Sequence, residues 1–525
     1  MALSKIIKQN CPECGKIAEE VSSIDFGDTK LITLKCGHMM SEAVVGSATG
    51  RIRNLAETKE LMQFQYDGVK FAEQANVRCL IADEQGLGKT VQAIALIKQH
   101  KQELLPALIV VPSSVKLQWH HQFVDWCGHE GYLCQTISSG KEFAVPGFQI
   151  YIVSYDLLKN ENILKMVKDS IQLVIVDECQ RIKNHTSERS KAVQDVCRNI
   201  PHVLMLSGTP IENNAGEYFT ALNILQPRRF PTYQHYLDGY CDYYFNGYGN
   251  KIGGLKNREL FHERTKDFII RRRKADVLKN LPKFSRDFDY VELDRKLNKA
   301  YAQGLEELEE IMYSDDMDSM AKGAAKIAIM SKLRHITGLS KVPDCVERVT
   351  DFLLSTEEKI VIFTHHTDAA QMLEADLNKW LKDGAYEPVL MFHSGLSSEE
   401  RYNLVQKFKE PKSRVMVAST KAAGTGLDGL QDVCCKMIML ERQWNPSTES
   451  QAEARLDRYG QKFPVSATYM IAGETIDEYF TELVEQKRAI VAGALDNRDV
   501  EWNEQSLMND LAEMLITKGR KKWVL

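Results

Sequence analysis

The sequence predicts an α/β protein in which two separate parallel β-sheets each carry helices on both faces. Short apolar runs of strand length alternate with helical patterns in two groups along the chain, the arrangement that parallel sheets require. One further run ends in a glycine-rich turn of the kind that binds phosphate. The runs comprise residues 107–111, 151–154, 173–176 and 203–206 in the first group, and 359–363, 389–392, 415–418, 437–440 and 467–471 in the second.

The composition is that of a multidomain globular protein. With 525 residues, of which 44% are hydrophobic, the chain is long enough for several domains with their own cores. The net charge of −5 excludes a basic surface over the whole chain, so any nucleic-acid contact has to be local, for example at the basic runs 271–274 and 518–522. We expect no membrane span and no signal peptide, because no apolar run reaches the required length. Most of the twelve cysteines are scattered singly, as is typical of reduced thiols.

The phosphate-binding turn lies at residues 80–90, where the sequence is Leu-Ile-Ala-Asp-Glu-Gln-Gly-Leu-Gly-Lys-Thr. Glycines let backbone N–H groups approach phosphate oxygens, and the following helix turns its positive end toward them. Lys89 is placed to reach the β- and γ-phosphates, and the Thr90 hydroxyl to bind Mg²⁺. Asp83 stands where the full phosphate-loop pattern has glycine. The alternative is a chance Gly-Lys-Thr at a helix start, which the motifs below disfavour.

Two acids end the apolar run at 173–176. Asp177 is placed to hold Mg²⁺, and Glu178 to orient and deprotonate the attacking water, which is the division of labour that nucleotide hydrolysis needs. Such an acid pair is common by itself, but after a Gly-Lys-Thr turn it is strong evidence for a site of nucleotide hydrolysis. The Ser-Gly-Thr-Pro turn at 207–210 is a candidate sensor of the γ-phosphate.

In the second group, the stretch 451–461 places Arg455 and Arg458 three residues apart on one face of an expected helix. Two such arginines can clamp the charge that develops on a γ-phosphate, as arginine fingers do. The alternative is a solvated basic face.

Residues 1–45 predict a zinc ribbon. Cys11 and Cys14 are followed some twenty residues later by Cys36 and His38, and four such ligands from two tight turns build a tetrahedral structural Zn²⁺ site. The alternative is two unrelated surface turns with free cysteines. Residues 46–60 are expected to be a linker.

Between the two groups, the pattern changes to an aromatic stretch at 233–248, the basic run, and a helix-favouring segment at 305–332. We expect a helical insertion at 229–345. We interpret the tyrosines as residues that pack inside this insertion; the alternative is that they stack on nucleic-acid bases.

Taken together, these motifs resemble the Snf2 family of double-stranded DNA translocases, within the superfamily 2 helicase-like motors, over residues 55–490. The middle region resembles the protrusion and linker of that family. Three short stretches, at 240–242, 336–339 and 363–366, resemble its fork-remodelling, annealing-helicase branch. The main motifs that carry the resemblance lie at 63–69, 83–90, 110–114, 153–155, 177–180, 207–213, 419–427, 444–446 and 451–461.

The resemblance implies two RecA-like lobes, at 61–228 and 346–495, followed by a tail at 496–525. It implies ATP and Mg²⁺ as cofactors, with Gln180 joining the catalytic residues and Gln65 reading the adenine. By the same resemblance, the nucleotide site comprises Gln65, Asp83, Gly86, Leu87, Gly88, Lys89, Thr90 and Gly426, and the DNA cleft is lined by Ser113, Lys116, Ser154, Tyr155, Ser394, Thr420 and Trp444.

The sequence also departs from the family, which usually has histidine at the position of Asp457 and isoleucine or leucine at that of Tyr459. The separate substrate-recognition domains of the annealing branch are not recognised either, and the zinc ribbon is expected to take their place.

We expect an ATP-dependent translocase that remodels double-stranded or branched DNA, or DNA–protein complexes, in replication, repair or recombination. One alternative is a motor that recycles RNA polymerase or another DNA-bound protein. A second is a non-catalytic scaffold, which the intact Lys89, Asp177 and Glu178 disfavour. The expected setting is a monomer in the cytoplasm of a bacterium or a virus-infected cell, or in the nucleus if the source is eukaryotic. We expect the zinc ribbon to serve targeting rather than catalysis, and a protein partner to bind through it.

Overall fold

The computed structural model describes most of the chain from residue 60 onward. It divides into two compact units, residues 1–57 and 58–525. The described residues are 60–127, 133–142, 145, 147–160, 163, 170–211, 214–245, 250–314, 319–383, 386–423, 427–495 and 515, together with the backbone of 5–10, 17–25, 29–34 and 39–43.

The first unit contains a four-stranded antiparallel sheet in the order β1-β2-β3-β4 over its described backbone. The four predicted zinc ligands, Cys11, Cys14, Cys36 and His38, lie outside the described residues. Among the residues that are described, no group of three or more His, Cys, Asp or Glu side chains is arranged to hold a metal ion. The strands are β1 (Lys5–Asn10), β2 (Ile17–Asp25), β3 (Thr29–Leu34) and β4 (Met39–Ala43).

The second unit begins with a sheet of seven strands in its described part, in the order β13-β5-β10-β9-β6-β8-β7, and every pair is parallel. The four predicted strands of the first group are confirmed. Each central strand is buried on both faces, which explains why these runs are almost wholly apolar. The strands are β5 (Arg78–Ile81), β6 (Ala107–Val111), β7 (Cys134–Thr136), β8 (Ile150–Ser154), β9 (Leu173–Asp177), β10 (His202–Leu206) and β13 (Ile269–Ile270).

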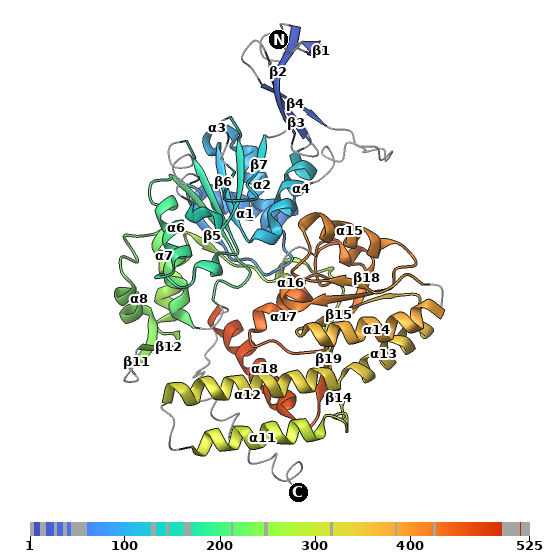
Figure 1. The fold of residues 1–525 in the computed structure, drawn as a ribbon. Helices are drawn as coiled ribbons and strands as arrows, with labels where there is room; N and C mark the ends of the chain where they lie inside the picture. The colour runs from blue at the N-terminus through green and yellow to red at the C-terminus, as the bar shows by residue number, and fades with distance from the viewer. Residues whose placement is uncertain are drawn as a thin grey trace. The chain divides into compact units, whose positions relative to one another are not determined.

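Helices cover both faces of this sheet, with α2 and α4 on one side and α6 and α7 on the other (Figure 1). Ser187 caps the N-terminus of α6, because its side chain accepts a hydrogen bond from the backbone N–H of Ser190. The helices of this lobe are α1 (Gln63–Gln74), α2 (Lys89–Gln99), α3 (Lys101–Leu104), α4 (Lys116–Cys127), α6 (Glu188–Cys197) and α7 (Phe219–Leu225), with short 3₁₀ turns at Ser113–Val115, Leu157–Lys159, Cys179–Ile182 and Ala215–Tyr218.

A second parallel sheet has the order β14-β19-β18-β15-β17-β16 in the described residues, and the five predicted strands of the second group are confirmed. Alternate residues of β15 enter different cores: Val361 and Phe363 pack on one face, and Ile360 and Ile362 on the other. The strands are β14 (Phe284–Val291), β15 (Lys359–Thr364), β16 (Leu390–Phe392), β17 (Val415–Ser419), β18 (Cys434–Met439) and β19 (Val465–Ala472).

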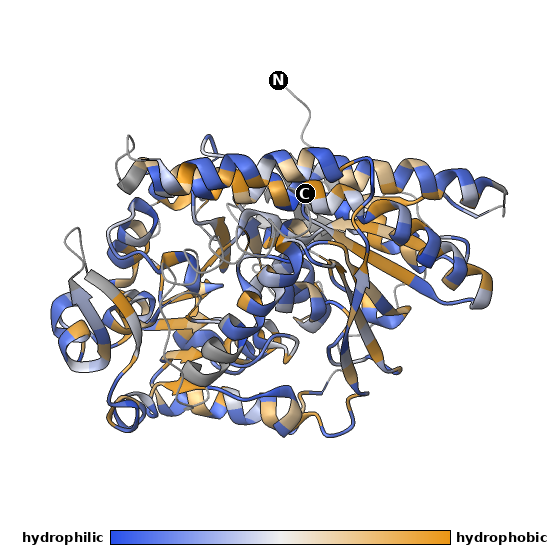
Figure 2. Cartoon of the chain, turned by 90° about the horizontal axis from the view of Figure 1, so that it is seen from below, coloured by the Kyte–Doolittle hydropathy of each residue, from blue (hydrophilic) through white to orange (hydrophobic). Residues whose placement is uncertain are grey.

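The helices of the second lobe surround this sheet. Figure 2 shows several strands largely in hydrophobic colours, whereas the helices carry both hydrophilic and hydrophobic residues, as amphipathic covering layers do. None of the described helices is long and apolar enough to cross a membrane. The helices are α13 (Val342–Ser355), α14 (Thr367–Asp383), α15 (Ser398–Lys409), α16 (Thr420–Ala423), α17 (Pro446–Glu453) and α18 (Ile476–Leu495), with a 3₁₀ turn at Leu430–Asp432.

The region predicted as a helical insertion is only partly helical. It contains an antiparallel hairpin, and it also supplies β13 to the edge of the first sheet and β14 to the edge of the second. The chain therefore crosses from one lobe to the other between these two strands. The elements are α8 (Tyr233–Tyr240), β11 (Cys241–Phe245), β12 (Asn250–Leu255), α9 (Arg258–Thr265), α10 (Lys274–Val277), α11 (Asn298–Tyr313) and α12 (Ser319–Ser340).

Two tyrosines of the aromatic stretch serve packing, as expected. Tyr236 and Tyr240 are buried, and their rings contact Phe230 and Phe261.

Farther along, α11 and α12 run side by side (Figure 1), and their apolar faces share a core with α18. Both segments are therefore built on ordinary hydrophobic packing.

A candidate nucleotide site between the two lobes

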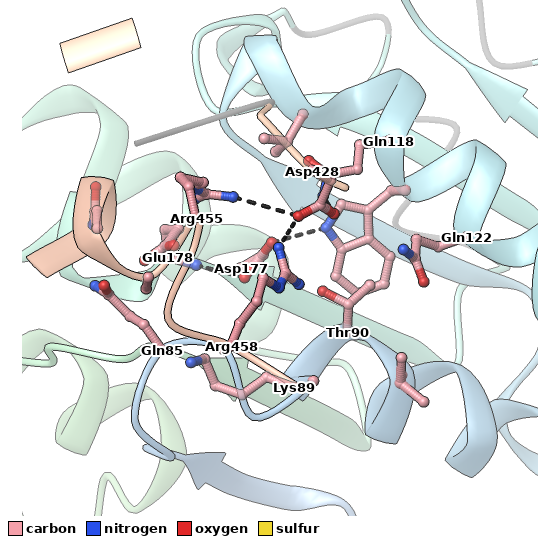
Figure 3. Close-up of a pocket in the computed structure, with 17 residues that line it drawn as sticks. Gln85, Lys89, Thr90, Gln118, Gln122, Asp177, Glu178, Asp428, Arg455 and Arg458 are labelled. Carbon is pink, nitrogen blue, oxygen red and sulfur yellow. Dashed lines mark hydrogen bonds and ion pairs between the residues drawn. The ribbon is translucent and has the colours of Figure 1, made fainter. Parts of the chain in front are cut away.

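One pocket in the described residues is lined by side chains from both lobes. The first lobe contributes the loop before α2, residues of α4 and the end of β9, and the second contributes the segment after β17 and the end of α17 (Figure 3). The lining residues are Gln85, Gly86, Gly88, Lys89, Thr90, Val91, Val115, Gln118, Trp119, Gln122, Asp177, Glu178, Asp428, Gln451, Ala454, Arg455 and Arg458.

The loop between β5 and α2 has the backbone that close approach to phosphate requires. Gly86 and Gly88 have φ values of +86° and +73°, a region that side chains with a Cβ disfavour. Lys89 Nζ donates to the backbone oxygen of Asp83 at 2.8 Å, and burial lowers the pKa of this lysine despite the nearby acids. Lys89 and Thr90 both line the pocket, as the sequence predicts.

The acid pair at the end of β9 lies opposite this loop. Trp119 Nε1 donates to Asp177 Oδ2 at 2.8 Å, and the Tyr155 hydroxyl donates to the backbone oxygen of Asp177 at 2.5 Å. Burial, reinforced by the neighbouring Glu178, raises the pKa of Asp177 to about 7. Because nearby positive charge only partly neutralises this buried carboxylate, Asp177 is a suitable ligand for a cation. Because Thr90 offers a hydroxyl oxygen in the same pocket, this donor set fits Mg²⁺.

Glu178 is held in an uncommon backbone conformation, with φ at +54°. Gln180 Nε2 donates to Glu178 Oε2 at 2.7 Å, and Gln180 Oε1 accepts from the Ser207 hydroxyl at 2.7 Å. From Ser207, the hydrogen bonds continue through Thr209, whose hydroxyl lies 2.9 Å from that of Ser447 in the second lobe. The acid is thus connected to the other lobe through four polar residues.

The two predicted arginines reach the pocket, but not from a helix. The helix prediction for 451–461 is wrong beyond Glu453, where α17 ends, and Arg455 and Arg458 lie in the turns that follow. Backbone hydrogen bonds to residues two to four positions earlier tighten the chain there, and Gly460 adopts a φ of +93°. Both guanidinium groups nevertheless point into the pocket (Figure 3).

Asp428 is a pocket residue that the sequence reasoning missed. It forms an ion pair with Arg458 and a weaker one, at 3.6 Å, with Arg455, and it accepts a hydrogen bond from Gln118 of α4. Burial favours the neutral acid, but the two arginines outweigh it and lower the pKa of Asp428 below its usual range. The sequence feature that could have indicated Asp428 is its place as an acid in the glycine-containing stretch after β17. Gln118, Trp119 and Gln122 were missed because nothing in the sequence of α4 marks its pocket-facing residues.

Other residues predicted for the nucleotide site lie around the pocket rather than in it. Gln65 Nε2 donates to the backbone oxygen of Leu87 at 3.2 Å, and the Leu87 side chain is buried. The Asp83 carboxylate is fully buried, where it binds Arg272 and Gln92. Gly426 lies outside the described residues. The roles given to these residues stay predictions.

The residues predicted to line a DNA cleft divide into two groups. Ser113 and Ser394 are exposed, and Trp444 is half-buried with its ring against Phe480. The other four are buried: Lys116 donates to the backbone oxygen of Ile137 and Thr420 to that of Thr364, while Ser154 is the last residue of β8 and Tyr155, which follows it, donates to the backbone oxygen of Asp177. Their predicted DNA contacts stay untested.

Buried charges anchor α17, the helix that leads into the arginine turns. Glu449 and Glu453 are almost inaccessible; Arg442 donates to the first, and Arg286 to the second at 2.6 Å. Although burial opposes ionisation, the arginine contacts lower the pKa of Glu453 to about 2. This helix is therefore tied to β14 and to the end of β18 by charged hydrogen bonds.

Two family models match the chain: "SNF2-related domain" over residues 64–347 and "Helicase conserved C-terminal domain" over residues 342–460. The chain is 30% identical over 449 residues to the mouse (Mus musculus) "DNA annealing helicase and endonuclease ZRANB3", covering 84% of this chain and 41% of the relative. It is 31% identical over 442 residues to the Xenopus tropicalis "SWI/SNF-related matrix-associated actin-dependent regulator of chromatin subfamily A-like protein 1", covering 83% of this chain and 45% of the relative.

A solved structure, "Sulfolobus solfataricus SWI2/SNF2 ATPase core in complex with dsDNA", is similar at 23% identity and a TM-score of 0.40, covering 88% of this chain and 97% of that one. The chain spans less than half the length of the two curated relatives described above. The annealing-helicase name of the mouse relative agrees with the branch that the sequence motifs indicated. Since the SNF2-related model alone matches more than half of the chain, this protein belongs to the SNF2-related family.

Proposed function

We propose that this protein is an ATP-driven translocase that moves along double-stranded DNA and remodels DNA structures or DNA–protein complexes. The observation that carries the proposal is a single pocket that combines Lys89, Asp177 and Glu178 of one lobe with Arg455 and Arg458 of the other. An ATPase site divided in this way is complete only when the lobes are together. Hydrolysis can therefore be coupled to their relative movement.

Each pocket residue has a task in this proposal. The loop N–H groups and Lys89 bind the phosphates, while Glu178, oriented by Gln180, takes a proton from the attacking water. Arg455 and Arg458 stabilise the charge on the transferred phosphoryl group. Mg²⁺, for which Thr90 and Asp177 are the fitting ligands, supplies further neutralisation of phosphate charge when bound.

The polar connection from Glu178 to Ser447 supports coupling between the lobes. Its members lie at the ends of β9 and β10 and at the start of α17, so a displacement of Glu178 is passed on through short hydrogen bonds. The choice of DNA as the track follows the names of the relatives, which include a DNA annealing helicase.

We expect duplex DNA to stimulate ATP hydrolysis and the protein to displace a third strand from a triplex, with little unwinding of a blunt duplex. Raising the salt concentration should weaken the stimulation, because contacts with phosphates dominate binding to a DNA backbone. ATP turnover with duplex DNA, single-stranded DNA and single-stranded RNA measures this, with Lys89→Ala as the inactive control. Equal stimulation by single-stranded RNA would contradict the choice of DNA, and no hydrolysis with any polymer would contradict the ATPase itself.

We also propose that residues 1–45 form a zinc ribbon that directs the motor to its substrate. The support is the spacing of its cysteines and histidine: Cys11 and Cys14 fall between β1 and β2 in the chain, and Cys36 and His38 between β3 and β4.

We expect one zinc per chain in the freshly purified protein and a loss of zinc in Cys14→Ser, because four ligands are needed to close a tetrahedral structural site. Metal analysis of both proteins measures this. Deleting 1–45 should leave DNA-independent ATPase activity near that of the full chain, since the pocket lies wholly after residue 84. Substoichiometric zinc that Cys14→Ser does not change would contradict the ribbon.

A further inference from the structure

Lys274, the first residue of α10, joins three separate parts of the molecule. Its Nζ donates to Asp457 Oδ2 at 2.6 Å and to the backbone oxygen of Asp457 at 2.7 Å, across the boundary between the lobes. Its backbone N–H donates to Glu84 Oε2 at 2.7 Å, just before the phosphate loop. The segment that links the two sheets thus contacts the phosphate loop and the arginine turn through one residue.

The Lys274–Asp457 pair is buried. Each of the two residues is only 8% exposed, and the second carboxylate oxygen of Asp457 has no hydrogen-bond partner among the described residues. Removing two charges from water costs free energy that their attraction only partly offsets, so such a pair adds little to stability. What it provides is a defined geometry, because either charge left alone in this position would be strongly unfavourable.

Asp457 lies between Arg455 and Arg458 in the chain, so whatever holds Asp457 also holds the backbone that presents both arginines. The packing is close at Gly86 of the phosphate loop: a Cβ added there would lie 3.0 Å from the Arg458 Cβ and 3.3 Å from the Lys274 Cε. The lysine stem, the phosphate loop and the arginine turn are therefore in direct contact.

The other end of the same basic run is anchored to the first lobe. Arg272 donates to the buried Asp83 carboxylate at 2.9 Å, and Arg271 donates to the backbone oxygen of Ala82 at 3.1 Å. Lys274 thus extends from a segment that is held rigidly against the end of β5. The arginine turn of the second lobe is positioned relative to this anchored segment.

We propose that Lys274 and Asp457 form a latch between the lobes that holds Arg455 and Arg458 over the phosphate loop. Both are positioning residues, since neither lines the pocket. This inference rests on the proposed ATPase function. It concerns the alignment of the arginines and not the binding of ATP, so losing the latch lowers kcat while ATP still binds.

The test is a double-mutant cycle with Lys274→Met, Asp457→Asn and the double variant, all in the full chain. We expect each variant to lower kcat by about tenfold, with little change in KM and in the Kd for a fluorescent ATP analogue. The double variant should be no slower than the slower single variant, because the ion pair between Lys274 Nζ and the Asp457 carboxylate is lost in all three. Asp276→Asn is the matched control: it breaks the neighbouring Arg273–Asp276 pair, which is solvent-exposed, and should keep the wild-type kcat.

Asp457→Asn is nearly isosteric with the native residue, so it carries the test alone if Lys274→Met does not fold. Effects on kcat that add in the double variant, an unchanged kcat in Asp457→Asn, or a loss of ATP binding that accounts for the slower rate would each overturn the latch. A wild-type protein that does not hydrolyse ATP would instead overturn the proposed function. The two failures are therefore distinct.

Discussion

Replacing Arg458 with alanine is expected to lower the rate of ATP hydrolysis on the order of 10³-fold, while ATP remains bound. The guanidinium group lies in the pocket, where it pairs with Asp428 (Figure 3). A γ-phosphate carries more charge than a carboxylate and offers oxygens for the same fork of N–H donors, so it competes effectively for this arginine. Because charge on the transferred group changes during the reaction, the lost contact affects kcat more than binding.

The measurement compares kcat with the Kd for an ATP analogue in wild type, Arg458→Ala and Arg458→Lys. Lysine keeps the charge but not the planar fork, so it should restore only part of the rate. Arg198→Ala is a suitable control, since this arginine is 72% exposed on the surface of the first lobe. A wild-type kcat in Arg458→Ala would exclude this residue from the reaction.

Lys89→Ala is expected to abolish turnover and Glu178→Gln to lower it strongly, for different reasons. Without Lys89, the phosphates lose the only lysine that lines the described pocket, so we expect ATP binding itself to fail. Glu178→Gln leaves that lysine in place but cannot accept a proton from water, so ATP should still bind while turnover falls by roughly 10²-fold or more.

Equilibrium binding and single-turnover hydrolysis separate these two effects. Lys191→Ala, which removes an exposed lysine of α6 that pairs with Glu188, serves as the control and should keep both properties. If Glu178→Gln hydrolyses ATP at the wild-type rate, another group must activate the water. If Lys89→Ala binds ATP normally, the phosphate site lies elsewhere.

The two sheets and the phosphate loop could be predicted from local sequence. A strand buried on both faces has to be apolar throughout, and a loop that binds phosphate needs glycine where φ is positive, so both leave a pattern within a few residues. The strands at 107–111 and 359–364, and Gly86 and Gly88 with their positive φ, follow these patterns.

The edge strands left a much weaker pattern. β13 has only two residues, and all side chains of β14 except the last are exposed or partly buried, since an edge strand is covered less completely than a central one. The middle region was therefore predicted to be helical, although it provides a strand to each sheet.

By itself, the sequence determined the order of the sheets' strands along the chain, the phosphate loop, the acid pair and the presence of two arginines near the end of the second lobe. Each of these depends on neighbouring residues alone. The tertiary structure decided which distant residues interact. Asp428 pairs with Arg458 and accepts a hydrogen bond from Gln118, Lys274 pairs with Asp457, and Asp83 pairs with Arg272. The sequence alone does not distinguish an Asp or Lys that is solvated from one that forms an ion pair. Its role is settled only when folding removes water and brings one specific opposite charge within hydrogen-bonding distance.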